Sequence, residues 1–214
     1  MTAAEGDGRD GGSVTSGHVY EVLDSRQTFA GRVIGIRSDD VAMPDGAVST
    51  RDVVVHPGAV AVVALDDADR LVMVRQYRHP VTERLWELPA GLLDVAGEPA
   101  VRAAARELEE EAGLRAARWD VLVDALTSPG MTDEAIRVFL ARDLVEVGRP
   151  AGEHEEAEMD AAWLALSDAV EQVLGGVIRN GVACIGILAA ATSARNAFAG
   201  LRPADSDWPD RPGH

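Results

Sequence analysis

The chain has 214 residues and a formal net charge of −16 at pH 7, and its 47% content of hydrophobic residues is typical of a globular protein of one domain, or one domain with an arm. The acidic balance argues against nucleic-acid polymers and anionic membranes as partners, because both bind basic surfaces. All 20 basic residues are arginine and Cys184 is the only cysteine, which excludes lysine chemistry, an intrachain disulfide and a cysteine-cluster metal site.

Residues 1–18 contain hardly any bulky apolar side chain, so we expect a disordered tail. Residues 19–56 predict a small antiparallel β arm, with alternating strands at 20–24 and 32–38, a turn at Pro44-Asp45-Gly46 and a further strand at 51–55. An arm this small cannot bury its own face. We therefore expect it to pack against a second subunit as a dimerisation element.

Residues 57–200 predict the main domain. The apolar runs 59–65 and 71–77, joined by a short acidic turn, indicate a buried hairpin. Further strands are expected at 119–126, 135–140 and 159–166, and helices from the cap Ser167 to 174 and over 180–199. Mixed strands with helices between and after them favour an α/β/α sandwich. The proline-rich tail 201–214 is expected to pack loosely, with Trp208 as its only anchor.

No signal pattern is found at the amino terminus. The longest apolar run, residues 182–191, is too short to span a bilayer. We therefore expect a protein of the cytoplasm, with no membrane partner.

A helix is expected between Pro99, which suits the first helical position, and Gly113, which can adopt the left-handed conformation just past the end. Its apolar stripe would contain Val101, Ala104, Ala105, Leu108 and Ala112.

The opposite face of this helix gathers three carboxylates, because Glu110 and Glu111 lie three and four residues after Glu107. Like charges at this spacing repel one another. Either solvent screens them, as on an ordinary acidic helix, or a cation offsets them. Hard oxygen ligands of this kind suit Mg²⁺ or Mn²⁺.

This stretch resembles the signature of the Nudix hydrolases, G-x5-E-x7-R-E-U-x-E-E-x-G-U, where U is aliphatic. Glu98, seven further residues, and the run from Arg106 to Leu114 match it position by position. The chain departs from the pattern between Gly91 and Glu98, where six residues stand in place of five. The resemblance implies an α/β/α sandwich with a mixed sheet, and it implies hydrolysis of a diphosphate bond with Mg²⁺ or Mn²⁺.

The resemblance also implies site roles. Glu107 and Glu111 would be metal ligands, Glu110 would share this role, and the carbonyl of Ala90 would be a further ligand. Arg106 would orient a ligand carboxylate.

Two further stretches resemble the ADP-ribose pyrophosphatase subfamily of actinobacterial type. Pro129 follows Gly113 by sixteen residues, and Gln76-Tyr77-Arg78 precedes the run from Trp86 to Gly91, which includes Glu87. The resemblance implies a homodimer that cleaves ADP-ribose to AMP and ribose 5-phosphate, with Arg78, Glu87 and Pro129 near the substrate. Pro129 is otherwise an ordinary turn proline.

Adenine needs a stacking surface, and aromatic residues make up only 4% of the chain. Phe29 and Tyr20 of the arm are candidates, and so is Arg51 through its guanidinium plane. The alternative is that both aromatic side chains simply belong to the core.

In relatives that cleave ADP-ribose, the catalytic base comes from a loop after the long strands. Here that loop is the acidic segment 148–158, in which Glu156 is the favoured base and Glu155 the second choice. A solvated surface loop is the alternative. Two other functions remain open, a Nudix pyrophosphatase for another nucleotide and a non-catalytic ADP-ribose sensor. The three glutamates of the helix argue against the sensor.

Overall fold

The computed structural model describes residues 18–149 and 159–212. Nearly all of the predicted tail 1–18 lies outside these ranges. The same holds for the segment that contains Glu155 and Glu156, so its predicted roles remain predictions.

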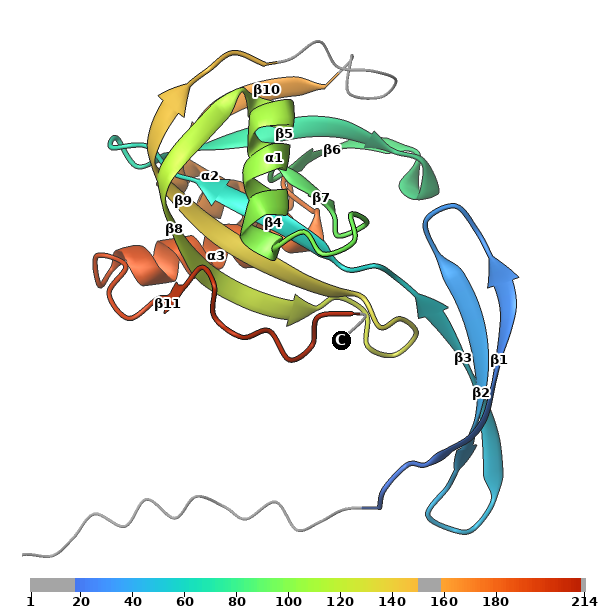
Figure 1. Ribbon diagram of the computed structural model, residues 1–214. Coiled ribbons are helices and arrows are strands. Elements are labelled where there is room, and N and C mark those ends of the chain that lie inside the picture. Colours follow the sequence, from blue (N-terminus) through green and yellow to red (C-terminus); the bar gives the residue numbers. More distant parts are fainter. Residues whose placement is uncertain (1–17, 150–158, 213–214) are drawn as a thin grey trace, which may run out of the picture.

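Three antiparallel strands form an arm that projects from the body of the molecule (Figure 1). β1 (Val22–Ala30) pairs with β2 (Gly35–Ala42), and β2 pairs with β3 (Val48–Val55). The predicted antiparallel arm is confirmed. Its strands are longer than the apolar alternation indicated, because polar cross-strand pairs such as Asp40 and Thr50 continue the ladder.

Two sheets form the body. The larger has the strand order β11-β8-β9-β4-β7, and the smaller has the order β10-β5-β6. β4 and β9 are parallel, whereas the other neighbours are antiparallel, so the sheet is mixed as predicted. The strands are β4 (Ala59–Ala64), β5 (Arg70–Arg78), β6 (Glu83–Glu87), β7 (Ala90–Leu92), β8 (Leu114–Leu126), β9 (Ala135–Glu146), β10 (Asp160–Ala165) and β11 (Arg202–Pro203).

The expected hairpin of residues 59–65 and 71–77 is wrong, because β4 and β5 belong to different sheets. An isolated bridge between Leu65 and Leu71 joins them beside the turn. All six residues of β4 are buried. A strand buried on both faces and both edges needs neighbours on each side, and here β9 and β7 supply them.

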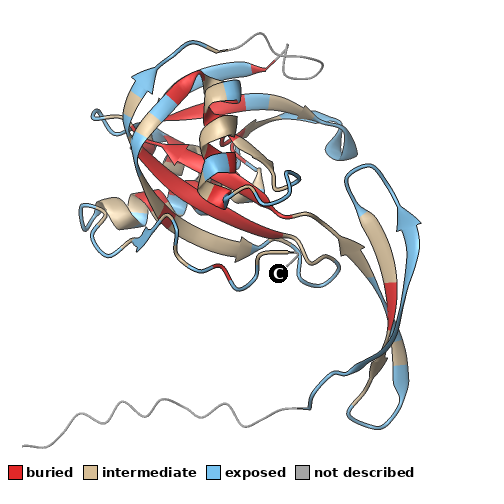
Figure 2. Ribbon diagram, viewed as in Figure 1, coloured by how far each residue is buried: buried red, intermediate tan, exposed pale blue. Residues whose placement is uncertain are grey.

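Helices cover both faces of the larger sheet, which confirms the α/β/α sandwich (Figure 1). α1 (Ala100–Ala112) packs on the face that carries Val60 and Val62. α2 (Leu166–Leu174) and α3 (Gly181–Ala194) pack on the face that carries Ala61 and Val63. The short 3₁₀ helix η1 (His79–Val81) follows β5. The buried residues concentrate in β4, β9 and the facing side of α1 (Figure 2). Among the described residues, no helix is both long and apolar enough to cross a membrane.

Several helix ends differ from the prediction. Pro99 is the extended cap of α1 and not its first helical residue, with ψ of 139°. Ser167 does not cap α2, because Ala165 stands at that position. α3 ends five residues earlier than expected, at Ala194, and the chain then turns through positive φ at Ala197 and Phe198. By contrast, Gly113 adopts the left-handed conformation predicted for it, with φ of 66°.

The buried face of α1 is rotated relative to the predicted stripe. Ala104 and Leu108 are buried as expected, but Val101, Ala105 and Ala112 are only half-buried. Their places are taken by Ala100, Ala103 and Glu111. The apolar pattern could not reveal this rotation, because one of the inward-facing side chains is a carboxylate.

The C-terminal segment is anchored by more than Trp208, contrary to the expectation. Arg137 of β9 is 2% exposed and donates to the carbonyl oxygens of Ser206 at 2.7 Å and Asp207 at 2.9 Å. Its guanidinium lies 4.8 Å from the ring centroid of Trp208. Arg211 donates to the carbonyl oxygen of Glu98 at 2.9 Å. The tail is therefore held against β9 and against the loop that precedes α1.

Candidate active site

Arg106 organises the carboxylates of α1. Its guanidinium donates to Glu107 at 2.6 Å and to Glu110 at 3.1 Å, and it reaches Glu98 at 3.4 and 3.5 Å. Although partial burial opposes the charge, Glu98 and Glu107 raise the pKa of Arg106 above its usual value. The predicted role of Arg106, to orient a ligand carboxylate, is thus consistent with its position.

Glu111 connects α1 to the start of β7. It is 6% exposed, and its Oε2 accepts a hydrogen bond from the backbone N–H of Ala90 at 2.9 Å. This bond fixes the Pro89–Ala90 peptide plane, next to the Ala90 carbonyl that is predicted to bind metal. A buried carboxylate needs such a donor, because desolvation without compensation costs several kcal/mol.

Gly91 allows β7 to approach α1 closely. A Cβ atom at this position would lie about 2.0 Å from Oε1 of Glu107 and 2.1 Å from its Cδ, which is an overlap. The glycine of the signature therefore lies against Glu107, although the loop that follows it is one residue longer than the family pattern. Ala90, Gly91, Glu107 and Glu111 are brought together at one place.

These oxygen donors have the chemistry that Mg²⁺ and Mn²⁺ prefer, so the residues fit a divalent cation. In the described conformation the carboxylates are held by protein donors, Glu107 and Glu110 by Arg106 and Glu111 by Ala90. Within residues 18–149 and 159–212, no three acidic, histidine or cysteine side chains already converge on one point.

A cavity of about 580 Å³ opens beside this cluster. Two predicted substrate residues line it: Arg78, and Glu87, which is 5% exposed at its side chain. Arg78 donates to both carboxylate oxygens of Glu87, at 2.9 and 2.7 Å. This two-point pair fixes the plane of the guanidinium. The cavity is also lined by His56, Ala90, Gly91, Thr127, Ser128, Glu134, Asn180 and Gly181, among others.

Pro129 lies in a tight turn next to this cavity. The N–H groups of Met131 and Thr132 both donate to the carbonyl oxygen of Ser128, at 3.0 and 3.1 Å. Ser128 lines the cavity, whereas Pro129 is not among its lining residues. The geometry suits an ordinary turn proline and leaves the predicted substrate role of Pro129 as a prediction.

The arm residues lie apart from the cavity within one chain. Phe29 is 51% exposed and Tyr20 is 60% exposed, so the alternative that they belong to the core is wrong. Arg51 is exposed and donates to Ser49 and to the carbonyl oxygen of Thr50. None of the three lines the cavity in the described part of the chain.

Residue-by-residue reasoning missed His56, Thr127 and Glu134. His56 directly follows the predicted strand 51–55, and the other two stand at the ends of the loop 127–134, which lies between the predicted strands 119–126 and 135–140. A weak signal existed, since this loop carries five polar side chains in eight residues, Thr127, Ser128, Thr132, Asp133 and Glu134.

A model of the NUDIX domain matches residues 55–181, which include all of α1 and every lining residue of the cavity except Val182 and Ile185. The chain is 51% identical over 195 residues to an ADP-ribose pyrophosphatase of Mycobacterium tuberculosis, covering 91% of this chain and 94% of that one. It is 39% identical to a methanol dehydrogenase activator of Bacillus methanolicus, covering 73% and 85%. The crystal structure of an ADP compounds hydrolase shares the fold, with a TM-score of 0.73 at 19% identity over 85% of this chain and 97% of that one. The chain belongs to the Nudix family.

Proposed function

We propose that this protein hydrolyses the diphosphate bond of ADP-ribose to AMP and ribose 5-phosphate. The observation that carries this proposal is the cluster of Ala90, Gly91, Glu107 and Glu111 beside a cavity of about 580 Å³ that also holds Arg78. Glu107 and Glu111 can bind a cation beside the cavity, and Arg78 presents a fixed guanidinium to it. A cation and a guanidinium together suit the negative charges of a diphosphate. The 51% identity to an ADP-ribose pyrophosphatase supports the choice of substrate.

The cofactor we propose is Mg²⁺ or Mn²⁺, held by Glu107, Glu111, Glu110 and the carbonyl oxygen of Ala90. When bound, such an ion neutralises phosphate charge and makes a bound water a better nucleophile. Arg106 would keep the carboxylates of Glu107 and Glu110 in place. Arg78, oriented by Glu87, would bind phosphate oxygens through its guanidinium.

The base we propose is Glu156, with Glu155 as the second choice, to take a proton from the attacking water. The two described residues that flank this segment support the placement. Arg149 donates to the carbonyl oxygen of Met159 at 2.6 Å, and it reaches the carbonyl oxygen of Glu110 at 3.4 Å. Both flanks of the segment therefore lie next to the C-terminal end of α1.

A panel of substrates tests the proposed function. ADP-ribose, a sugar nucleotide, a dinucleotide polyphosphate and an oxidised nucleoside triphosphate are compared at equal concentration with Mg²⁺ and with Mn²⁺. We expect ADP-ribose to have the highest kcat/KM. If kcat/KM for ADP-ribose is tenfold below that of another compound, that compound replaces ADP-ribose as the proposed substrate. The protein would then be a Nudix pyrophosphatase for another nucleotide. No turnover of any compound would favour a non-catalytic sensor.

We further propose a homodimer in which the arm of one chain helps to complete the site of the other, in the cytoplasm. All nine residues of β1 are exposed, among them the apolar Val22, Leu23 and Phe29. An exposed strand with apolar side chains suits an interface with a partner chain, which supports the proposed dimer. Light scattering on the full chain is expected to give about twice the mass of 22.6 kDa. A monomer mass at micromolar concentration would contradict the dimer.

A further inference from the structure

The segment 127–134, between β8 and β9, touches two parts of the molecule at once. Thr127, Ser128 and Glu134 line the cavity that holds Arg78. The residues between them contact the base of the arm, where β3 ends and the chain enters the body (Figure 1). A single short segment thus forms one wall of the candidate active site and also the surface to which the base of the arm is bound, which we call the seat of the arm.

Backbone contacts make the first part of this connection. The N–H of Val54 donates to the carbonyl oxygen of Met131 at 2.8 Å. The carbonyl oxygen of Val54 in turn accepts from the N–H of Asp133 at 3.3 Å and from the hydroxyl of Thr132 at 3.0 Å. The end of β3 is therefore bound to the segment almost as a strand is bound to its neighbour.

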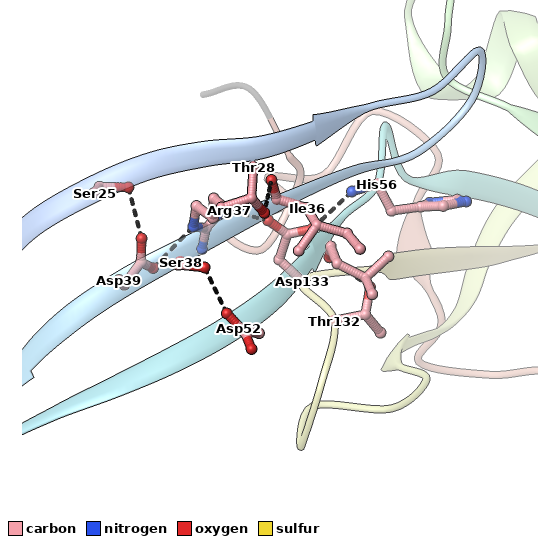
Figure 3. A network of polar contacts seen from close by, with 11 residues as sticks. Ser25, Thr28, Ile36, Arg37, Ser38, Asp39, Asp52, His56, Thr132 and Asp133 are labelled. Atoms are coloured by element: carbon pink, nitrogen blue, oxygen red, sulfur yellow. Dashed lines mark hydrogen bonds and ion pairs between the residues drawn. The ribbon is translucent and has the colours of Figure 1, made fainter.

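The Asp133 carboxylate makes the second part, and Figure 3 shows how it reaches in two directions. Oδ1 accepts the backbone N–H of His56 at 2.9 Å, and Oδ2 accepts Nη1 of Arg37 at 2.9 Å. Arg37 belongs to β2, and its Nε donates to Asp39 at 2.9 Å. Ser25 of β1 donates to the same Asp39 at 2.6 Å. Polar contacts thus run from the outermost strand of the arm to the body.

His56 joins the seat of the arm to the cavity. Its Nδ1 accepts the N–H of Gly58 at 3.1 Å, so the proton of a neutral ring is on Nε2. Nε2 lies 3.5 Å from Oε1 of Glu134, and the other oxygen of that carboxylate accepts the hydroxyl of Thr127. The residue whose N–H is held by Asp133 therefore also faces the carboxylate on the cavity wall.

We propose that Asp133 is a positioning residue that couples the arm to the substrate cavity, so that the placement of the arm sets substrate affinity. Asp133 does not itself line the cavity, and among the described residues its carboxylate contacts the lining at the backbone N–H of His56. Its effect reaches the cavity through His56 and Glu134 on one side and through the arm on the other. The inference rests on the proposed function, because it assigns this coupling to binding of ADP-ribose.

The test compares Asp133→Asn with Arg26→Gln. Asparagine keeps the shape and can still accept the His56 N–H, but it loses the charge that holds Arg37. Arg26 is a matched control, because it also pairs with aspartates of the arm, Asp24 and Asp40, but in the described residues none of the three bonds to segment 127–134. We expect D133N to raise KM for ADP-ribose by about three- to tenfold with kcat within about twofold, since uniform binding energy is lost. R26Q is expected to leave both values unchanged.

Hydrogen exchange provides a second readout that does not need a substrate. D133N is expected to speed amide exchange in residues 48–56 and 127–134, whereas R26Q leaves both segments protected. An unchanged KM in D133N, or an equal rise in R26Q, would overturn the proposal. If D133N does not fold, Arg37→Gln replaces it, and an unchanged KM there overturns the proposal equally. If the wild type does not cleave ADP-ribose, the proposed function fails, and unchanged exchange in residues 127–134 alone decides against Asp133.

Discussion

Glu107→Gln is expected to lower kcat for ADP-ribose by about 10²- to 10³-fold at saturating Mg²⁺. Glutamine keeps the length of the side chain, so the close contact with Gly91 is preserved. The loss of charge weakens both the proposed cation site and the bond from Arg106 at 2.6 Å. Steady-state kinetics measure kcat, and a titration with Mn²⁺ measures cation affinity. We expect the variant to show a lower kcat and a lower cation affinity than the wild type.

Glu109→Gln is the matched control on the same helix. Glu109 is paired with Arg115, whose hydrogen bonds hold the pKa of this carboxylate below its usual value. It stands at a variable position of the signature and outside the cluster. E109Q should therefore keep wild-type kcat and cation affinity. Wild-type turnover in E107Q would show that the assignment of the cation site to this face of α1 is wrong.

Glu156→Gln is expected to lower kcat by about 10²- to 10⁴-fold with KM for ADP-ribose nearly unchanged. A general base acts in the chemical step, so its removal affects turnover more than binding. The loss should also remove the acidic limb of the pH profile of kcat, because that limb reports the deprotonation of the base. Stopped assays between pH 5 and pH 9 would measure both effects.

Glu155→Gln is the neighbour control for this prediction. It removes an equal charge from the same segment and is expected to keep kcat within a few-fold of the wild type. A fully active E156Q with an inactive E155Q would move the base to Glu155. Full activity of both variants would place the base outside this segment, which would then be an ordinary acidic surface loop.

The local parts of the site could be predicted from the sequence. The cluster on α1 depends on residues within one helix, whose spacing alone puts Glu107 and Glu111 near each other. Gly113 ends the helix in the left-handed conformation that was expected of it. The antiparallel arm was also predictable, because its strands are joined by short turns.

Contacts between distant residues could not be predicted in this way. The sequence does not reveal that β4 pairs with β9 and not with β5. β9 lies about seventy residues further along the chain. Two buried apolar strands joined by a short turn are compatible with either pairing. Arg137 and the C-terminal segment form a similar case, since an arginine within an apolar strand does not indicate that it binds backbone carbonyls at Ser206 and Asp207.

The difference between the predicted and the observed buried face of α1 is also caused by a contact between residues that are distant in the sequence. Amphipathic patterns assign carboxylates to the solvent side, and Glu111 breaks that rule because a backbone N–H of β7 compensates its burial. The wall made by His56, Thr127 and Glu134 was missed because its residues come from two segments about seventy residues apart. These two departures from the local pattern lie at the candidate active site, where polar groups are buried with specific partners.

The most direct test of the proposed function is a competition assay. ADP-ribose and the other nucleotides are mixed at equal concentration with Mg²⁺, and the initial rates of product formation are followed in one vessel, which gives the ratio of their kcat/KM values. We expect AMP and ribose 5-phosphate to form in equal amounts and at least tenfold faster than any other product, and to form about 10²- to 10³-fold more slowly with E107Q. A faster release of products from another nucleotide, or unchanged AMP formation with E107Q, would contradict the proposal.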